Sequence, residues 1–391
     1  MRGVVLLLLS LTATAHAGEP PLQALAIEAG PDQPVYAEAE DGTVLVAQAA
    51  DRAVHPASVS KVPTTLALLR RLGPTYRFQT RLVATGPVRD GVVHGDLLVD
   101  GGRDPFLVYE GACLMLRRLY ERGIRRISGD LQVRGPLLFN WQPDLDGHRF
   151  GATLTGRDGG SAWGIVAGMP GGTVPATLAS AGLQLGHQPA AGEPPTNTTL
   201  VVHRSPPLLH VVKVLNGYSN NVFHLVSEQI GGPAAVEAIA RDSVPAAYRD
   251  EIKIDNGAGA GTTNRLSPRA ATALLAALER ELKASGHTRA DVLPVSGVDP
   301  GTLDERFLEH RGLMIGKTGT FGDVGSSALA GVLKTRRYGE VRFAVLNSWV
   351  PVPEARRKQD AFVRALAAAT DAVGWPYNAA VRPDFTSAEL E

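Results

Sequence analysis

The segment Ser58-Val59-Ser60-Lys61-Val62-Pro63 places a serine and a lysine three positions apart at the start of an amphipathic helix that runs to about Leu72. Residues three apart in a helix lie on the same face, so the two side chains can meet. A serine hydroxyl becomes a nucleophile only when a neighbour accepts its proton, and a lysine with a lowered pKa can do so. Pro63 suits the first helical turn, and Gly73-Pro74 ends the helix. Alone, this four-residue pattern is weak, because it often arises by chance.

Two further motifs follow in order, Ser219-Asn220-Asn221 and Lys317-Thr318-Gly319-Thr320. Taken singly, Asn221 fits a helix cap and Lys317 a surface lysine. Together with the Ser58 segment, they resemble the active-site set of serine β-lactamases and penicillin-binding proteins. The resemblance implies an α/β (α+β) fold, in which a transpeptidase/β-lactamase-like domain combines an antiparallel sheet with helices.

Each catalytic side chain has a physical role in such a site. Ser58 is the expected nucleophile and Lys61 its proton partner. Ser219 can relay the proton between Lys61 and the leaving amine, while the Asn221 amide can hold a substrate amide and the Lys61 ammonium. The backbone N–H groups of Ser58 and Thr320 would form the oxyanion hole. Neither a metal nor an organic cofactor is needed for this chemistry.

The third motif is expected to bind substrate. Lys317 supplies a positive charge that suits a terminal carboxylate, and the hydroxyls of Thr318 and Thr320 assist it. Gly319 is expected to leave room where substrate lies along the strand edge.

The distance along the chain between the first two motifs predicts an inserted domain. Ser58 and Ser219 are 161 positions apart, far more than a compact β-lactamase needs. Between about residues 80 and 204, short β-like runs alternate with Gly/Asp turns around one helix near Gly111–Arg122. We therefore expect a catalytic domain from residues 18–79 and 205–391, interrupted by a mostly β domain of residues 80–204. The stretches 147–172 and 189–197 are expected to be loop-like.

The flanking sequence fits one α/β domain. Val35–Gln48 alternates around Asp41-Gly42, which predicts a hairpin. Near the other end, Ala328–Leu333 and Val341–Leu346 look like buried antiparallel strands, and Glu354–Val373 like a long helix.

Over most of its length the chain resembles the class C low-molecular-mass penicillin-binding proteins, the D-alanyl-D-alanine carboxypeptidase/endopeptidase family. The segments that carry this resemblance are Pro56–Lys61, Leu72–Pro74, Arg77-Phe78, Gly95–Leu97, Asp104-Pro105, Ile127–Asp130, Tyr218–Asn221, Gly316–Thr320 and Leu329–Gly331. Two departures concern substrate recognition. The family's D-G-S-G-L-S-R loop appears only as Asn256–Thr262, without its serines and arginine. The acidic, tryptophan-rich stretch that supplies an aspartate for the substrate's diamino acid is barely recognisable around Trp141–Asp146.

Composition narrows the compartment and the partners. The 39 basic and 39 acidic residues leave no net charge, which argues against nucleic-acid binding. Arg2, the apolar run Val4–Leu11 and Ala15-His16-Ala17 predict a signal peptide at residues 1–17, too short to span a bilayer. We expect an exported, periplasmic or wall-associated protein without a transmembrane segment after cleavage. Cys113 is the only cysteine, which excludes an intramolecular disulfide, and it is expected to be buried.

The resulting functional hypothesis is a serine-type D-alanyl-D-alanine carboxypeptidase or endopeptidase, acting on peptidoglycan stem peptides and acylated by β-lactams. Two alternatives stay open. One is an esterase or amidase that reuses the same residues, and the other is a penicillin-binding but nearly inactive wall-binding or sensor protein. Carboxypeptidase versus endopeptidase preference, the diamino acid of the substrate, the oligomeric state and the effect of the altered 256–262 loop do not follow from the sequence.

Overall fold

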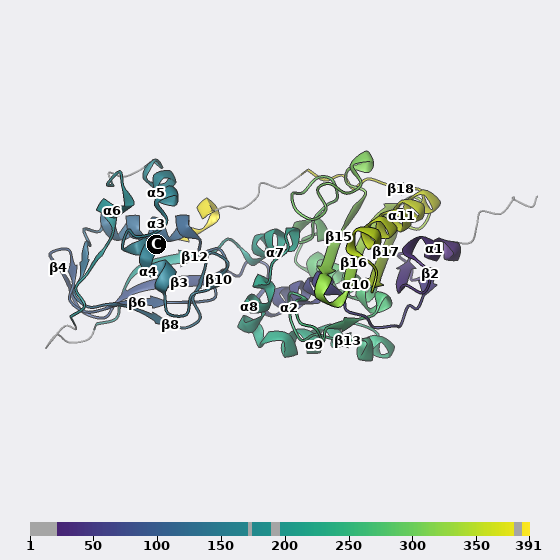
Figure 1. Ribbon diagram of the computed structural model, residues 1–391, viewed down its shortest axis with the longest axis horizontal. Coiled ribbons are helices and arrows are strands. Elements are labelled where there is room, and N and C mark those ends of the chain that lie inside the picture. The colour runs from purple at the N-terminus through teal and green to yellow at the C-terminus, as the bar shows by residue number, and fades with distance from the viewer. Residues whose placement is uncertain (1–21, 171–173, 189–195, 379–384) are drawn as a thin grey trace, which may run out of the picture.

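The computed structural model describes residues 22–170, 174–188, 196–378 and 385–391. The chain forms two lobes side by side (Figure 1). The larger lobe contains the three sequence motifs, and the smaller lobe is made mainly from the middle of the chain. The expected signal peptide at residues 1–17 lies outside the described residues, as does most of the expected loop 189–197.

An antiparallel sheet forms the centre of the larger lobe. Its strand order is β15-β16-β17-β1-β2, and a short strand, β18, pairs with β16. The strands are β1 (Val35–Glu38), β2 (Val44–Gln48), β15 (Met314–Phe321), β16 (Ser326–Thr335), β17 (Glu340–Ser348) and β18 (Ala372–Val373). The expected hairpin at the N-terminus and the pair of buried strands near the C-terminus are both present. The long helix ends earlier than expected, because Asp371 adopts a left-handed conformation (φ 53°) and Val373 pairs with Lys334.

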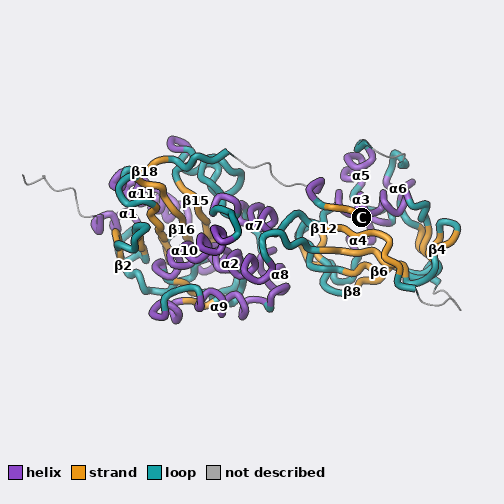
Figure 2. Tube along the Cα trace, turned by 180° about the vertical axis from the view of Figure 1, so that it is seen from behind, coloured by secondary structure: helices purple, strands orange, loops and turns teal. Residues whose placement is uncertain are grey.

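Helices cover both faces of this sheet, as Figure 2 also shows. Successive residues of a strand face opposite sides, and β16 follows this rule. Leu329 and Leu333 pack with Phe362 and Leu366 of α11 on one face, while Ala330 faces the core that holds α2 and α10. The helices of this lobe are α1 (Ala26–Ala29), α2 (Lys61–Leu72), α7 (Leu208–Gly217), α8 (Val222–Ser227), α9 (Gly232–Asp242), α10 (Pro268–Ala284) and α11 (Val352–Thr370).

The smaller lobe has its own core and its own sheets. One sheet runs β19-β12-β3-β6-β8, in which β19 is Glu389–Leu390, and a second runs β11-β7-β5-β4. The longer strands are β3 (Gln79–Ala84), β6 (Leu97–Asp100), β8 (Leu131–Arg134) and β12 (Thr198–Arg204), and the short ones are β4 (Val88–Arg89), β5 (Val92–Val93), β7 (Arg126–Ile127), β9 (Leu138–Phe139), β10 (Gln142–Pro143) and β11 (Gln184–Leu185). None of the strands described between residues 79 and 204 joins the sheet that carries Lys317.

This lobe is richer in helix than its sequence led us to expect. Besides α3 (Tyr109–Glu121), it contains α4 (His148–Leu154), α5 (Gly160–Ala167) and α6 (Leu178–Ala181). The loop expected at 147–172 is therefore wrong for the described residues, and helices accompany the expected β-strands. Phe150 and Trp163 are buried in the lobe's core, so tertiary packing orders a stretch whose glycines disfavour helix. Cys113 is buried in the same core, and burial raises its pKa to about 12.

The chain enters and leaves the smaller lobe at neighbouring points. Phe78 N donates to Ser205 Oγ at 3.0 Å, and Ser205 N donates to Phe78 O at 2.9 Å. Immediately beyond them, β3 and β12 pair antiparallel from Gln79 opposite Arg204. Adjacent entry and exit points are what an inserted domain requires.

The C-terminus does not stay with the larger lobe. The last strand, β19 (Glu389–Leu390), pairs with β12, and Val202 and Glu391 exchange backbone hydrogen bonds of 3.1 and 3.0 Å. Figure 1 shows this end of the chain against the smaller lobe. The expected assignment of residues 205–391 to the catalytic domain is thus wrong at its last residues. No helix in the described part of the chain is both long and apolar enough to cross a membrane.

Candidate active site

The proposed nucleophile lies in a tight turn at the entrance to α2. Ser58 belongs to a 3-10 helix, Ala57–Ser60, that continues directly into α2, so Lys61 starts the α-helix. Ala57 has a φ of 46°, a left-handed conformation that is rare for a residue with a side chain and costs free energy. Such strain persists only where the surrounding structure holds it, and here two glycines do so.

Both glycines lie directly against the backbone of the turn. A Cβ at position 319 on β15 would lie 2.7 Å from Pro56 O and 3.0 Å from Ser58 N. A Cβ at position 259 would lie 1.9 Å from Ala57 O. Gly319 was expected to leave room for substrate, but the space beside it is filled by the backbone of the nucleophile turn.

The loop that departs from the family pattern supports this turn. Thr64 Oγ1 donates to Gly257 O at 2.7 Å, and His55 Nε2 lies 2.6 Å from Gly261 O. Asn264 Nδ2 donates to Ser60 Oγ at 2.8 Å, and Asn264 Oδ1 accepts the N–H groups of residues 255 and 256. The 256–262 segment therefore positions the helix that carries Ser58 and Lys61, a role that its backbone can fill without serines or arginine.

Lys61 is fully buried and, among the described residues, forms no ion pair with a carboxylate. Its Nζ donates to Tyr218 O at 3.1 Å and lies 5.5 Å from the centre of the Phe223 ring. Burial, and secondly the charge of Lys317, hold the Lys61 pKa well below its usual range. A neutral amine beside a serine can accept a proton.

The second motif is only partly assembled around this amine. Ser219 lines the same cleft as Ser58, whereas Asn221 is exposed at the start of α8 and lies outside the residues that line the cleft. Asn220, to which we assigned no role, donates to Leu215 O at 2.9 Å and to Tyr218 O at 3.1 Å. Asn220 and Lys61 therefore share one acceptor, the carbonyl that shapes the motif's turn.

The third motif lies on the edge strand β15. Lys317 is 1% exposed, and its Nζ donates to Thr318 O at 2.8 Å. Burial lowers the Lys317 pKa to about 7. Thr318 Oγ1 is hydrogen-bonded to Thr302 Oγ1 at 2.6 Å, and Thr320 Oγ1 accepts a hydrogen bond of 3.3 Å from Arg356 Nη2.

A cleft of about 550 Å³ joins these motifs. Ser58, Ser219, Lys317, Thr318 and Thr320 all line it. The rest of the lining comes from the 301–306 loop and from α11. These residues are Gly301, Thr302, Asp304, Glu305, Arg306, Arg356 and Asp360. The sequence analysis did not identify them, because no motif marks them and because the residue pattern of the α11 segment indicated only which of its side chains are buried.

The comparison with protein families decides the identity. The sequence profile described as the D-Ala-D-Ala carboxypeptidase 3 (S13) family matches residues 33–138 and 172–369. The chain belongs to this family. The resemblance stated from the motifs is thereby confirmed, together with the penicillin-recognising fold class and a serine-type D-Ala-D-Ala carboxypeptidase as the class of enzyme.

Individual S13 relatives agree. Carboxypeptidase DacB of Mycolicibacterium smegmatis is 28% identical over 372 residues, covering 80% of this chain and 75% of that protein. D-alanyl-D-alanine carboxypeptidase DacB of Haemophilus influenzae is 35% identical over 75 residues, covering 19% of this chain and 16% of that protein.

Solved structures show the same fold. The penicillin G-acylated predatory endopeptidase Bd3459 of Bdellovibrio bacteriovorus has a TM-score of 0.72 at 23% identity, covering 91% of this chain and 98% of that one. Penicillin-binding protein 4 (dacB) of Haemophilus influenzae has a TM-score of 0.62 at 17% identity, covering 90% and 99%.

The stretch between the two parts of the S13 profile match, residues 139–171, includes the degenerate Trp141–Asp146 segment. Trp141 packs edge-on against Phe106, with 5.3 Å between ring centres. Asp144 is buried and accepts the backbone N–H groups of Arg149 and Phe150, so it caps α4. Asp144 is therefore committed to structure and not to a substrate's amine.

Proposed function

We propose that this S13 enzyme hydrolyses D-alanyl-D-alanine bonds of peptidoglycan stem peptides through an acyl-enzyme on Ser58. One observation carries the assignment of residues: Ser58, Ser219 and Lys317 line one cleft, with the buried amine of Lys61 behind them. Three chain segments far apart in sequence thus supply one site.

The chemistry depends on the protonation state of Lys61. Neutral Lys61 accepts the Ser58 proton while the oxygen attacks the carbonyl of the penultimate D-alanine. The N–H groups of Ser58 and Thr320 stabilise the oxyanion, and Ser219 passes a proton to the departing amine. Water then hydrolyses the ester. Apart from the substrate and this water, every group in the scheme is a side chain or backbone amide of the chain.

Among the described residues, the Ser58 hydroxyl makes no hydrogen bond, and Lys61 is bonded to Tyr218 O. Catalytic hydrogen bonds are often long in the absence of substrate and tighten in the complex. Binding is therefore expected to bring Lys61 Nζ to Ser58 Oγ, and to turn the exposed Asn221 amide toward the substrate.

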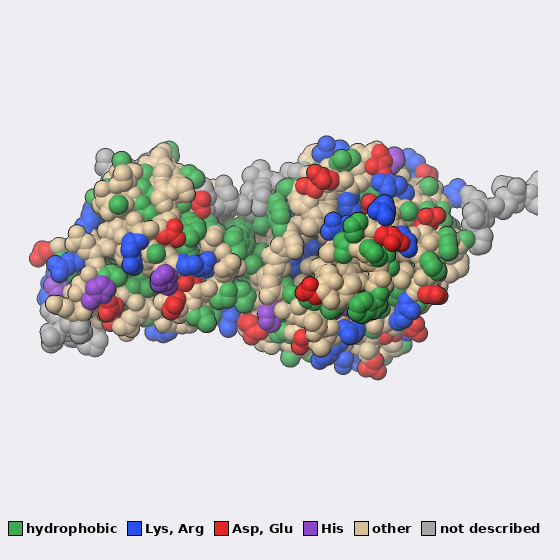
Figure 3. Space-filling view, viewed as in Figure 1, with side chains coloured by type: hydrophobic (Ala, Val, Ile, Leu, Met, Phe, Trp, Pro, Cys, Tyr) green, Lys and Arg blue, Asp and Glu red, His purple; other side chains and the backbone are tan. Residues whose placement is uncertain are grey.

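Several finer statements belong to the same proposal. The enzyme is exported to the periplasm by the signal peptide at residues 1–17, and β-lactams acylate it covalently. Residues 80–204 form an inserted domain that positions peptidoglycan over the cleft. Charged side chains of both signs are interspersed on the face of the molecule in Figure 3, which agrees with a ligand other than nucleic acid.

The test combines labelling with product analysis. Fluorescent penicillin should label the protein, and Ser58→Ala should abolish labelling without lowering the melting temperature. Label retained in that variant would remove Ser58 from the mechanism. Digestion of purified peptidoglycan, with fragments identified by mass spectrometry, separates carboxypeptidase from endopeptidase products. Labelling without any product would favour the nearly inactive wall-binding or sensor protein, whereas turnover only of small esters or amides would favour the esterase or amidase.

A further inference from the structure

Three basic side chains line the cleft, and their partners differ. Lys317 is buried, and among the described residues its amine is hydrogen-bonded to a carbonyl oxygen alone. Arg306 is ion-paired with Asp360 through both its Nε and its Nη2 atoms. Arg356 lines the cleft one helical turn before Asp360 on α11 and is exposed.

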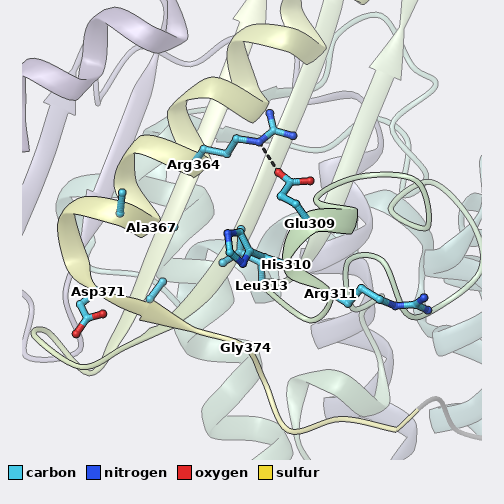
Figure 4. A pocket seen from close by; sticks show the side chains of 10 residues that line it. Glu309, His310, Arg311, Leu313, Arg364, Ala367, Asp371 and Gly374 are labelled. Carbon is cyan, nitrogen blue, oxygen red and sulfur yellow. Dashed lines mark hydrogen bonds and ion pairs between the residues drawn. The ribbon is translucent and has the colours of Figure 1, made fainter.

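Among the described residues, Arg356 has no carboxylate partner, and its one side-chain hydrogen bond is the 3.3 Å contact from Nη2 to Thr320 Oγ1. Arg364, two turns further along the same helix, provides a contrast. Arg364 faces a separate pocket, where its Nε is 2.6 Å from Glu309, as Figure 4 shows. An arginine with an acidic partner has its charge matched, whereas Arg356 presents its charge to the cleft.

The two threonines of the third motif are not equivalent. Thr318 Oγ1 is engaged by Thr302 Oγ1 at 2.6 Å. Thr320 Oγ1 accepts from Arg356 and keeps its own proton available for a ligand. A hydroxyl that accepts from a cation becomes a better donor, so a carboxylate beside Thr320 would bind to a polarised hydrogen-bond chain.

We propose that Arg356 is a specificity-determining residue that binds the substrate's carboxylate together with Lys317, directly and through Thr320. This inference rests on the proposed function, because it takes the substrate to be a peptide with a carboxylate on the residue after the scissile bond. Such a carboxylate occurs on a terminal D-alanine and on the D-centre of a cross-linking diamino acid.

The presence of both a lysine and an arginine affects how the attraction for the carboxylate depends on pH. Lys317 loses its charge near neutrality, since burial disfavours the ammonium. An exposed guanidinium keeps its charge at all pH values of interest. Lys61 interacts electrostatically with Lys317, and the other titratable groups that line the cleft with Lys317 are Asp304, Glu305, Arg306, Arg356 and Asp360. Above neutral pH, Arg356 should therefore supply most of the attraction for the carboxylate.

The experiment compares two acyl donors that differ only in charge: an acyl-D-alanyl thioester with a thioglycolate leaving group, and its neutral methyl ester. Thiol release gives kcat/KM for each. At pH 8.5, Arg356→Gln should lower kcat/KM for the charged donor about tenfold. The neutral donor should change by less than about twofold, and the loss on the charged donor should be smaller at pH 6. Arg356→Lys should restore part of the loss.

Arg357→Gln is the matched control, since Arg357 is an exposed arginine on the same turn of α11 but outside the cleft lining. It should leave both donors unaffected. Equal losses on both donors in Arg356→Gln would mean that Arg356 only holds β15 in place, and no loss on the charged donor would also overturn the inference. A loss that is no larger at pH 8.5 than at pH 6 would overturn the division of charge between Arg356 and Lys317. Thiol release that still requires Ser58 would show that the proposed function stands regardless of these outcomes.

Discussion

The contact between Gly319 and the nucleophile turn leads to a sharp prediction for Gly319→Ala. The added Cβ would lie 2.7 Å from Pro56 O, 3.0 Å from Ser58 N and 3.1 Å from Ala57 Cβ, while ordinary van der Waals contact begins at 3.4 Å. The turn and β15 must therefore separate by about 0.7 Å. The clash cannot be relieved by side-chain rotation, because the atoms that the new Cβ meets belong to the backbone or are a Cβ bonded directly to it.

The expected effect is larger on catalysis than on folding. A misplacement on the order of 1 Å can reduce a rate about a hundredfold, because attack depends on the alignment of the nucleophile. Overpacking costs roughly 1–3 kcal/mol of stability. Acylation by fluorescent penicillin, followed by stopped-flow, should therefore slow by about 10- to 100-fold in a protein that still melts cooperatively.

Gly322→Ala is the control, because a Cβ there meets nothing within 4 Å although the residue follows directly after β15. It should acylate at the wild-type rate. If Gly319→Ala also acylated at that rate, the close approach would not fix the position of Ser58, and the strain at Ala57 would need another explanation.

Three further predictions concern stability and the two lobes. Because burial lowers the Lys317 pKa from 10.5 to about 7, the unfolded chain binds more protons than the folded one between these values, so stability should rise with pH across this window by up to about 1.4 kcal/mol per unit. The free energy of unfolding measured in urea should rise with pH in the wild type and rise less steeply in Lys317→Met. Equal slopes in the two proteins would contradict the lowered pKa of Lys317. Deleting residues 385–391 should speed amide exchange of Val202, whose N–H donates to Glu391 O, without changing acylation; unchanged exchange would place the tail elsewhere. Replacing residues 80–203 with a Gly/Ser linker should keep penicillin acylation but lower the melting temperature, since Phe106 and Trp141 pack into the larger lobe's core; complete loss of acylation in a folded protein would show that the lobes are not independent.

The sequence predicted the elements whose pattern is local. The Ser58 helix, the hairpin from Val35 and the two strands flanking residues 336–337 each have a regular period and a turn or stop signal, and each is present. The helices α4 and α5 lacked such signals. Their glycines favour loops, and they are helical because aromatic side chains such as Trp163 are buried against α3.

The active site was predictable only as far as its motifs reach. Ser58, Ser219 and Lys317 converge on one cleft, but the residues opposite them come from a loop and from the exposed side of a helix. Arg356 reads in the sequence as an ordinary solvated charge, and only its contact with Thr320 reveals which surface it faces. The final residues were misassigned for the same reason, because a two-residue strand pair carries no signal in the sequence.

The departures from the family pattern affect two separate functions of the site. The 256–262 loop still supports the nucleophile, because Gly257 and Gly261 contribute carbonyl oxygens and Gly259 contributes a close approach, and neither depends on the missing side chains. Recognition of a substrate's diamino acid would depend on side chains, and Asp144 is unavailable for it. Acylation should therefore be preserved, while selectivity should shift to the carboxylate end of the substrate, where Lys317 is proposed and Arg356 is inferred to act.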